Sequence, residues 1–363
     1  RHDFLGAETR KLGALANTKD SAALNGDRAM LDDAERVARR RLHGGDAAVD
    51  KQAVPHMHLP LGERNWYGKA MSGWPNLSDL LVAVDADAPV GLVGAPLGLG
   101  SVTPRGCDQA PALLRKTLRR IGRYDIETGR EIATRIVDHG DVEIAGLSID
   151  QATNPIQHAV EASTARHGLT LLVGGNNAVT RPGVLGLGMP LEKVGLITLD
   201  AHFDMRDTDE GLSNGNPVRA LIEDGLPGAN IAQVGLASFA NSATMHRDAV
   251  EAGNLIVTLG EVRLNGIVPA IERALTHVDH CEAILVDCDI DVIDRSQFPG
   301  APGARPGGMA ATGFFKAVRD LAAGPGVRVI DLTEWDPPLD PTDLSALTAA
   351  RWVAECLAGY ELR

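Results

Sequence analysis

The sequence predicts a three-layer α/β fold, in which helices cover both faces of a central, mostly parallel sheet. From about residue 88 onward, short runs rich in Val, Ile and Leu alternate with amphipathic segments. Continuous apolar runs of this kind are typical of strands that are buried on both faces. The order strand, helix, strand repeats about eight times, and this order implies parallel strands joined by crossover helices.

The elements follow one another along the chain in a regular order. The segment WPNLSDLL (74–81) comes first and predicts a turn before a short helix, because Pro and Asn favour turns. Helices are then predicted at 108–120, 150–167, 265–278 and 309–323. The strands are predicted at VGLVGAP, TRIVDHGD, LTLLVGG, VGLITLDAH, NIAQVGL, NLIVTLGE, AILVDCDID and VRVIDLTEW. Four of these runs end in polar residues, and ligands bind at the carboxyl ends of parallel strands.

Composition divides the chain into two regions. Residues 1–87 carry polar helical patches, and we expect them to form an extension that packs on the core or on a neighbouring subunit. Trp66, Tyr67 and Trp74 are the expected contacts of this extension. Residues 88–363 are predicted to form the α/β domain.

Charge and cysteine usage narrow the class of protein. The 363 residues carry a formal net charge of -13, which argues against a nucleic-acid partner because such partners require clustered Lys and Arg. No apolar stretch approaches the roughly 18 residues of a membrane span, and the N-terminus lacks the apolar region of a signal peptide. The four cysteines show no CxxC spacing, which favours a reducing compartment. We therefore expect a cytoplasmic protein that binds neither nucleic acid nor membrane.

The first chemical motif is LITLDAHFDMRD (196–207), at the end of a predicted strand. Asp200, His202 and Asp204 are spaced by two residues, so an extended backbone places all three side chains on one side. One imidazole between two carboxylates suits a divalent ion such as Mn, Ni or Zn.

The second motif is AILVDCDIDVID (283–294), in which Asp287, Asp289 and Asp291 again share a face. Three carboxylates at the mouth of an apolar strand repel one another unless a cation offsets their charge. Either motif alone is compatible with a helix N-cap or an exposed acidic turn. The two together predict two adjacent metal ions, which lower the pKa of a bridging water.

These motifs resemble the paired signatures of the ureohydrolase superfamily, which comprises arginase, agmatinase, formimidoylglutamase and enzymes that hydrolyse guanidine and metformin. The resemblance is carried by DAHFD, by DCDIDVIDRSQFPGAPGARPGG, and by the segments 91–115 and 331–337 in family order. It covers roughly residues 88–360. It implies a three-layer fold around an eight-stranded parallel sheet, a small guanidino-type substrate, and a homo- or hetero-oligomer, usually a trimer or hexamer.

The resemblance also implies the ligands of a binuclear Mn2+ or Ni2+ centre. The second ion keeps its full set, with Asp200 and Asp289 bridging and His202 and Asp291 completing it. The first ion keeps Asp200, Asp204 and Asp289. The sequence does not distinguish Mn from Ni, because both accept the same oxygen and nitrogen donors.

One corner of the implied first site departs from the family pattern. The family loop Gly-Gly-Asp-His is here Gly174, Gly175, Asn176 and Asn177, so the histidine ligand is replaced by Asn177. A carboxamide oxygen is a poorer ligand than imidazole for these ions. We therefore expect Asn177 to be a weak ligand and the first site to be empty or weakly occupied.

Three further positions bear on catalysis and specificity. Glu334 matches the family carboxylate that grips the planar amidinium group, a suitable partner for bidentate pairing. Asn214 stands where arginases and agmatinases carry a proton-shuttling histidine; an amide orients a substrate but does not titrate. Arg206 stands where arginases carry an Asn, so arginine is not the expected substrate. Specificity is expected to lie in the loops 205–216 and 295–308.

Two functions remain open on these grounds. In the first, a metal-bound hydroxide attacks the central carbon of a guanidino, biguanide or formimidoyl compound, Asp204 orients the hydroxide and Glu334 holds the cation. In the second, the chain is a metal-poor, catalytically impaired subunit that supports an active paralogue in a hetero-oligomer, as in metformin hydrolase. The surviving ligands favour the first function, and Asn177 and Asn214 favour the second.

Overall fold

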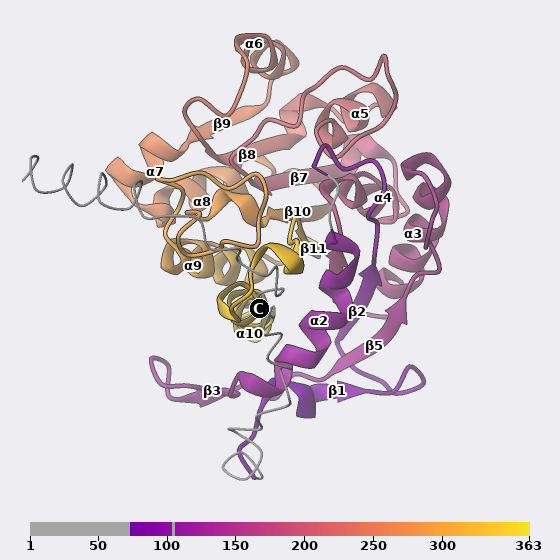
Figure 1. Ribbon diagram of the computed structural model, residues 1–363, viewed down its shortest axis with the longest axis vertical. Coiled ribbons are helices and arrows are strands. Elements are labelled where there is room, and N and C mark those ends of the chain that lie inside the picture. Colours follow the sequence, from indigo (N-terminus) through magenta and orange to yellow (C-terminus); the bar gives the residue numbers. More distant parts are fainter. Residues whose placement is uncertain (1–72, 104–105) are drawn as a thin grey trace, which may run out of the picture. The chain divides into compact units, whose positions relative to one another are not determined.

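A nine-stranded sheet runs through the part of the protein that the computed structural model describes, residues 73–103 and 106–363 (Figure 1). Every neighbouring pair of strands in this sheet is parallel. The predicted α/β fold is therefore confirmed. In spatial order the strands are β1 (Leu81–Val82), β5 (Ile136–Asp141), β2 (Val90–Ala95), β6 (Leu169–Gly174), β11 (Val327–Thr333), β10 (Ala283–Asp289), β7 (Val194–Leu199), β8 (Ile231–Leu236) and β9 (Leu255–Thr258).

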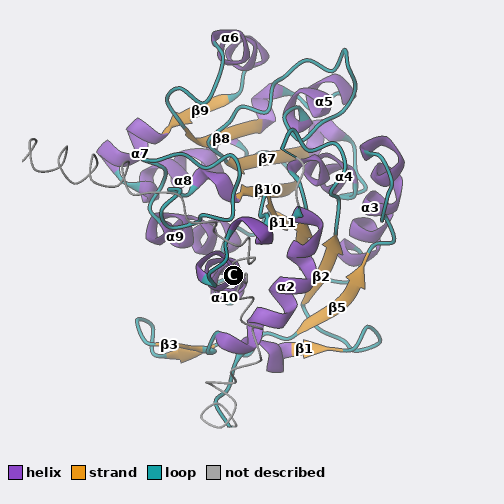
Figure 2. Ribbon diagram, viewed as in Figure 1, coloured by secondary structure: helices purple, strands orange, loops and turns teal. Residues whose placement is uncertain are grey.

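Helices cover both faces of the sheet, which gives the three predicted layers (Figure 2). One face packs against α3 (Ile149–Thr164), α4 (Thr180–Leu185) and α5 (Pro217–Asp224). The other face packs against α2 (Ala110–Thr117), α8 (Ile267–His277), α9 (Ala311–Ala322) and α10 (Leu344–Tyr360). The remaining described helices are α6 (Ala243–Ala252) and α7 (Leu259–Asn265), both near the β9 edge of the sheet (Figure 1).

All eight apolar runs singled out in the sequence form strands, from β2 to β11 with the exception of β3 and β4. The central strands β6, β7, β8 and β10 are buried at every position, so their side chains pack on both helical layers. β3 (Tyr124–Asp125) and β4 (Arg130–Glu131) form a separate antiparallel pair. The ninth strand, β1, was not expected; its two residues extend the sheet beyond β5.

The start of the described chain belongs to the sheet unit. The described residues from 73 onward form one unit, and β1 lies within the segment that the sequence assigned to an extension. The predicted turn and short helix are present as a 3-10 helix, Leu77–Leu80, which Asn76 caps through its side chain. Trp74 is 60 % exposed. Trp66 and Tyr67 lie outside the described residues, so the packing of the extension stays a prediction.

Within the described ranges, none of the helices has both the length and the apolar character that a membrane crossing requires.

Candidate metal centre

The two acidic motifs lie side by side at the carboxyl edge of the sheet. β7 and β10 are neighbours, and their register pairs Leu199 with Cys288. Asp200 and Asp289 therefore follow at the same level of two adjacent strands. Both carboxylates are almost completely buried, as are Asp204 and Asp291.

Two clusters of these side chains have the spacing of a metal site. Asp200, His202 and Asp291 form one cluster, and Asp200, Asp204 and Asp289 form the other. Within each cluster the potential ligand atoms all lie within 4.8 Å of one another. Asp200 belongs to both clusters, which is the arrangement expected of a carboxylate that bridges two ions.

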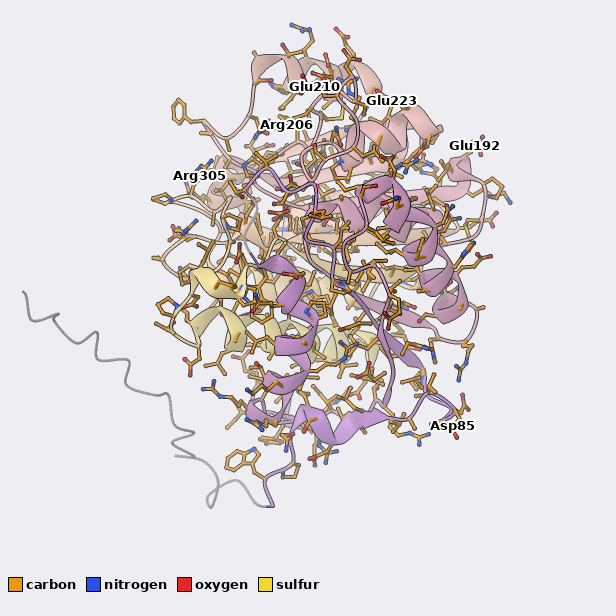
Figure 3. The ribbon with its side chains drawn as sticks, turned by 45° about the vertical axis from the view of Figure 1, so that its right-hand side comes forward. Asp85, Glu192, Arg206, Glu210, Glu223 and Arg305 are labelled. Atoms are coloured by element: carbon orange, nitrogen blue, oxygen red, sulfur yellow. The ribbon has the colours of Figure 1, made fainter. Side chains whose placement is uncertain are left out.

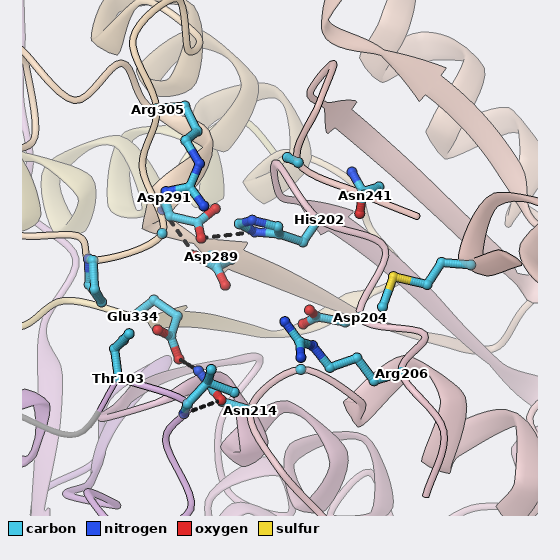
Figure 4. Close-up of a pocket in the computed structure, with 16 residues that line it drawn as sticks. Thr103, His202, Asp204, Arg206, Asn214, Asn241, Asp289, Asp291, Arg305 and Glu334 are labelled. Atoms are coloured by element: carbon cyan, nitrogen blue, oxygen red, sulfur yellow. Dashed lines mark hydrogen bonds and ion pairs between the residues drawn. The ribbon is translucent and has the colours of Figure 1, made fainter. Parts of the chain in front are cut away.

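The surroundings of the cluster formed by Asp200, His202 and Asp291 fit a bound cation. Nδ1 of His202 lies 3.0 Å from Oδ2 of Asp291 (Figure 4). It lies 3.5 Å from Oδ1 of Asp200. Oδ1 of Asp291 is buried and has no hydrogen-bond partner among the described residues. A buried carboxylate oxygen without a partner is costly, and a divalent ion would satisfy it.

Protonation offsets part of the negative charge in the metal-free protein. Burial lowers the pKa of His202, but Asp291 and Asp200 outweigh it and raise this pKa to about 12. Burial and the neighbouring carboxylates raise the pKa of Asp200 and of Asp289 well above their ordinary range. Burial also raises the pKa of Asp204 to about 7. An ion that enters must therefore displace protons from its ligands.

Asn177 occupies the corner of the site where the sequence predicts a weak ligand. Its carboxamide is completely buried. Nδ2 donates a hydrogen bond of 2.5 Å to Oδ2 of Asp204. Oδ1 accepts hydrogen bonds from the hydroxyls of Thr180, at 2.9 Å, and Thr333, at 2.8 Å. The atom that faces Asp204 is thus an amide nitrogen, which carries hydrogens and is no metal ligand in this orientation.

Glu334 lies beside the carboxylate clusters and is held through one oxygen only. Oε1 accepts hydrogen bonds from the backbone N–H of Asn177, at 2.8 Å, and from Nδ2 of Asn214, at 2.9 Å. Both bonds go to Oε1, which leaves Oε2 for a ligand. Burial raises the pKa of Glu334 to about 7. Asn214 in turn accepts a hydrogen bond from the backbone of Val102, so it ties Glu334 to the loop after β2 (Figure 4).

Backbone strain is concentrated at this site. Only three described residues other than glycine have a positive φ: Asp204 at 52°, Glu334 at 58° and Phe239 at 64°. A left-handed conformation is unfavourable for such residues and persists where the surrounding structure enforces it, commonly at functional sites. Two of the three are the residues that the sequence assigned to catalysis.

A pocket of about 220 Å3 opens above these side chains. This volume suits a small molecule, since pockets for drug-sized ligands are usually larger. The loops that were expected to set specificity contribute Arg206, Asn214 and Gly215, and Pro302, Gly303 and Arg305. The sequence missed two further segments of the wall, which contribute Val102, Thr103, Ala240, Asn241 and Met245.

Arg206 and Arg305 give this pocket a cationic rim. Their side chains come from different loops and lie on either side of the carboxylates (Figure 4). Both are exposed toward the same end of the protein (Figure 3). In the described chain neither guanidinium forms an ion pair, so both are available to a bound anion. Arg305 was not singled out in the sequence, where nothing distinguishes it from Arg295, the other arginine of its loop.

His139, the other histidine at a predicted strand end, lies outside the pocket. Its Nε2 is 2.9 Å from Nε2 of His167, whose Nδ1 is 2.8 Å from the carbonyl oxygen of Ala88. These contacts are structural.

Comparison with known proteins identifies relatives over most of the chain. A family model described as Arginase family matches residues 88–359. Formimidoylglutamase from Bacillus subtilis is 30% identical over 294 residues, which cover 79% of this chain and 92% of the relative. The human mitochondrial guanidino acid hydrolase is 26% identical over 270 residues, 73% of this chain and 76% of the relative.

Solved structures agree with this comparison. The crystal structure of formimidoylglutamase from Bacillus subtilis matches with a TM-score of 0.76 and 27% identity, covering 90% of this chain and 99% of that one. A Trypanosoma cruzi formiminoglutamase with two Mn2+ ions has the same fold, with a TM-score of 0.74 and 23% identity over 80% of this chain and 99% of that one.

Proposed function

The chain belongs to the arginase family, and we propose that it cleaves a C–N bond in a small amidine that carries an acidic group. It is a hydrolase of linear amidines whose relatives act on formimidoyl and guanidino compounds in a metal-dependent reaction. The observation that carries the proposal is the pair of carboxylate clusters sharing Asp200, beside the free oxygen of Glu334.

The residues present fit two divalent ions. Asp200, His202 and Asp291 would hold one ion, and Asp200, Asp204 and Asp289 the other. The family resemblance adds Asp289 to the ligands of the ion beside His202, as a second bridge. Carboxylate and imidazole ligands suit Mn2+ and Ni2+ alike, and the manganese pair in the trypanosomal structure favours Mn2+. When bound, such a pair supplies a hydroxide nucleophile near neutral pH.

The protein's own groups bind and orient the substrate. Oε2 of Glu334 accepts from the N–H groups of a planar amidinium, while Asn177 and Asn214 fix the carboxylate through Oε1. Asp204, held by Asn177 and by its strained backbone, orients the nucleophile toward the amidine carbon. Asn214 positions Glu334 but cannot deliver a proton to the leaving amine.

The cationic rim selects the other end of the substrate. Arg206 and Arg305 are the exposed, unpaired cations of the described pocket wall, and a guanidinium pairs well with a carboxylate. Their charge disfavours a substrate with a cationic tail, such as agmatine. The tail of arginine carries an ammonium group beside its carboxylate, so we expect this rim to favour arginine less than a tail that carries carboxylate alone. Metformin and guanidine have no acidic group for this rim.

The test is a comparison of amidines that differ in the charge of the tail. The full chain, loaded with Mn2+, is assayed with N-formimidoylglutamate, 4-guanidinobutyrate, agmatine and metformin for release of formamide, urea or amine. We expect turnover of the two acidic compounds, and an increase in KM of about 10-fold in each of Arg206→Gln and Arg305→Gln, with kcat changed less. Arg247→Gln, an exposed position in α6, is the control. Preferred turnover of agmatine would contradict the proposal.

A second candidate function rests on Asn177 and Asn214. Neither amide titrates near neutral pH, and in this structure both are engaged with carboxylates of the site. Under this alternative the chain binds little metal and supports an active paralogue in a hetero-oligomer. Metal content distinguishes the two functions: two ions per chain in protein purified alone, together with turnover, would exclude the silent subunit.

A further inference from the structure

The segment that carries His202 and Asp204 is held by a side chain from the loop after β8. The segment follows the end of β7, so its backbone groups depend on partners outside the sheet. Oδ1 of Asn241 accepts a hydrogen bond of 2.8 Å from the backbone N–H of Phe203, and Nδ2 donates one of 2.9 Å to the carbonyl oxygen of Ala201 (Figure 4). A backbone N–H only donates and a backbone carbonyl only accepts, which fixes the orientation of this carboxamide. One side chain therefore holds the peptide groups on both sides of His202.

The peptide group between Phe203 and Asp204 is held separately, from β8 itself. Nε2 of Gln233 donates a hydrogen bond of 2.9 Å to the carbonyl oxygen of Phe203. Gln233 is completely buried, and its Oε1 accepts a hydrogen bond of 2.9 Å from Nδ2 of Asn254. The peptide group that Gln233 holds is the one about which φ of Asp204 is measured, and this φ is 52°. Gln233 is thus placed to keep Asp204 in a conformation that is otherwise unfavourable.

The loop after β8 is itself strained where it presents Asn241. Phe239 has a φ of 64°, and its side chain is fully exposed, so packing of the ring within the described chain does not account for the strain. The backbone N–H of Ala237 donates to the carbonyl oxygen of Ala201 at 3.0 Å, and that of Ala240 donates to Ala237 at 3.4 Å. These bonds join the turn to the segment after β7 and bring Asn241 against it.

We propose that Asn241 and Gln233 are positioning residues, each for a different metal ion. Asn241 holds His202 in place for the second ion, and Gln233 holds Asp204 in place for the first. The inference rests on the proposed function, because it requires an ion at each cluster. His202 belongs to one cluster and Asp204 to the other, so the loss of either amide should act mainly on one ion.

Mn2+ binding tests the two amides separately. Free Mn2+ is followed by electron paramagnetic resonance during titration of the full chain, and a bound pair is recognised by a spin-coupled spectrum that a single bound ion does not give. We expect Asn241→Leu to weaken the second ion and Gln233→Met to weaken the first, each by about 10-fold or more, as is usual for groups that orient a ligand. The other ion should change less in each variant. Asp204→Asn, which alters a ligand of the first ion alone, identifies the binding step of that ion.

Asn230→Leu is the matched control for the loss of a buried amide. Asn230 lies just before β8, and its Nδ2 likewise donates to backbone carbonyl oxygens, those of Glu192 and Val194. Val194 begins β7, so these bonds lie at the end of the strand opposite to the metal clusters. Asn230→Leu should bind both ions with the affinity of the wild type.

Wild-type affinity for both ions in either Asn241→Leu or Gln233→Met would overturn the inference while leaving the proposed function intact. Equal weakening of the two ions in each variant, or an equal loss in Asn230→Leu, would overturn it as well, because the amides would then have only a general structural role.

A crystal structure of the wild-type chain with Mn2+ gives an independent answer that does not depend on the stability of the variants. We expect two ions, a positive φ at Asp204, and the hydrogen bonds of Gln233 and Asn241 to residues 201–203. Two ions without these bonds would overturn the inference alone. No ion at either cluster would overturn it together with the proposed function.

Discussion

At the scale of single residues, the two carboxylate oxygens of Glu334 differ clearly in their hydrogen-bond partners. Oε1 is held by the protein, and we propose that Oε2 binds the substrate. In Glu334→Gln the side-chain oxygen can keep both bonds, while the amide nitrogen faces the pocket and carries no charge. A hydrogen bond to a charged group contributes about 1.5–3 kcal/mol, so kcat/KM should fall by about 10- to 100-fold. Steady-state kinetics with an acidic amidine measures this loss.

A matched glutamate separates the loss of charge from any general effect of the substitution. Oε1 of Glu361, near the C-terminal end of the chain, likewise accepts several hydrogen bonds: two from the backbone N–H groups of Ala133 and Thr134, and one from the hydroxyl of Thr134. Glu361→Gln should retain wild-type kinetics. Equal losses in Glu334→Gln and Glu361→Gln would remove the special role assigned to Glu334.

The sequence predicted Asp200, His202 and Asp204 as site residues from their spacing by two residues after a strand, and the structure places them in the two clusters. The extended backbone assumed for that prediction ends with β7 at Leu199, and Asp204 has a positive φ. The orientation of Asn177 could not be predicted, since it depends on Thr333, which lies 156 positions away in the chain. Arg305 was missed for a similar reason: the path of its loop decides whether it faces the pocket.

At the scale of elements, the loop 295–308 approaches the metal clusters so closely that it requires a glycine. A Cβ atom on Gly303 would lie 1.9 Å from Oδ2 of Asp291 and 3.2 Å from Cε1 of His202. Gly303→Ala must therefore displace the loop or these two ligands. We expect binding of the second ion to weaken by about 10- to 100-fold, as when other groups around metal ligands are disturbed.

Mn2+ titration of Gly303→Ala beside Gly260→Ala checks this expectation. A Cβ on Gly260, in α7, would have only an ordinary contact of 3.7 Å with Oγ1 of Thr258, so that variant should bind both ions as wild type does. Wild-type affinity in Gly303→Ala would show that the loop moves away without effect on the ligands.

The strands were predictable because the same property defines them in sequence and in space. Runs such as 283–289 are apolar at most positions, since both faces of a parallel strand are covered. β1 escaped prediction because two residues are too short for any periodicity, and its place depends on pairing with β5. The short pair of β3 and β4 escaped for the same reason.

At the scale of the whole molecule, the sheet concentrates negative charge at one end of its central strands. β10 ends at a carboxylate, Asp289, and carboxylates directly follow β7 and β11; the surrounding apolar layers leave little solvent to screen them. Without the two ions that we propose for this region, its carboxylates carry charges that the folded chain accommodates only by taking up protons. The stability of the metal-free protein should therefore depend on pH in a way that the metal-loaded protein does not.

The direction of this dependence follows from the raised pKa values. Burial raises the pKa of Asp204, Asp331 and Glu334 to about 7, whereas these groups titrate near 4 in an unfolded chain. Between those values the folded state binds more protons than the unfolded state, so the free energy of unfolding falls as the pH rises. His139 and His277 act in the opposite sense, because burial lowers their pKa values.

Comparing the protein with and without ions isolates the contribution of the metal centre. His139 lies outside the pocket and His277 ends α8, so their effect is the same in both states and cancels in the difference. Mn2+ must displace protons from its ligands at low pH, and its binding stabilises the folded state by mass action. We therefore expect the rise in Tm that Mn2+ produces over an EDTA-treated sample to grow steadily from pH 5.5 to pH 7.5. Thermal melts at fixed ionic strength measure it, and a shift that stays constant or shrinks over this range would mean that the buried carboxylates do not hold the ions.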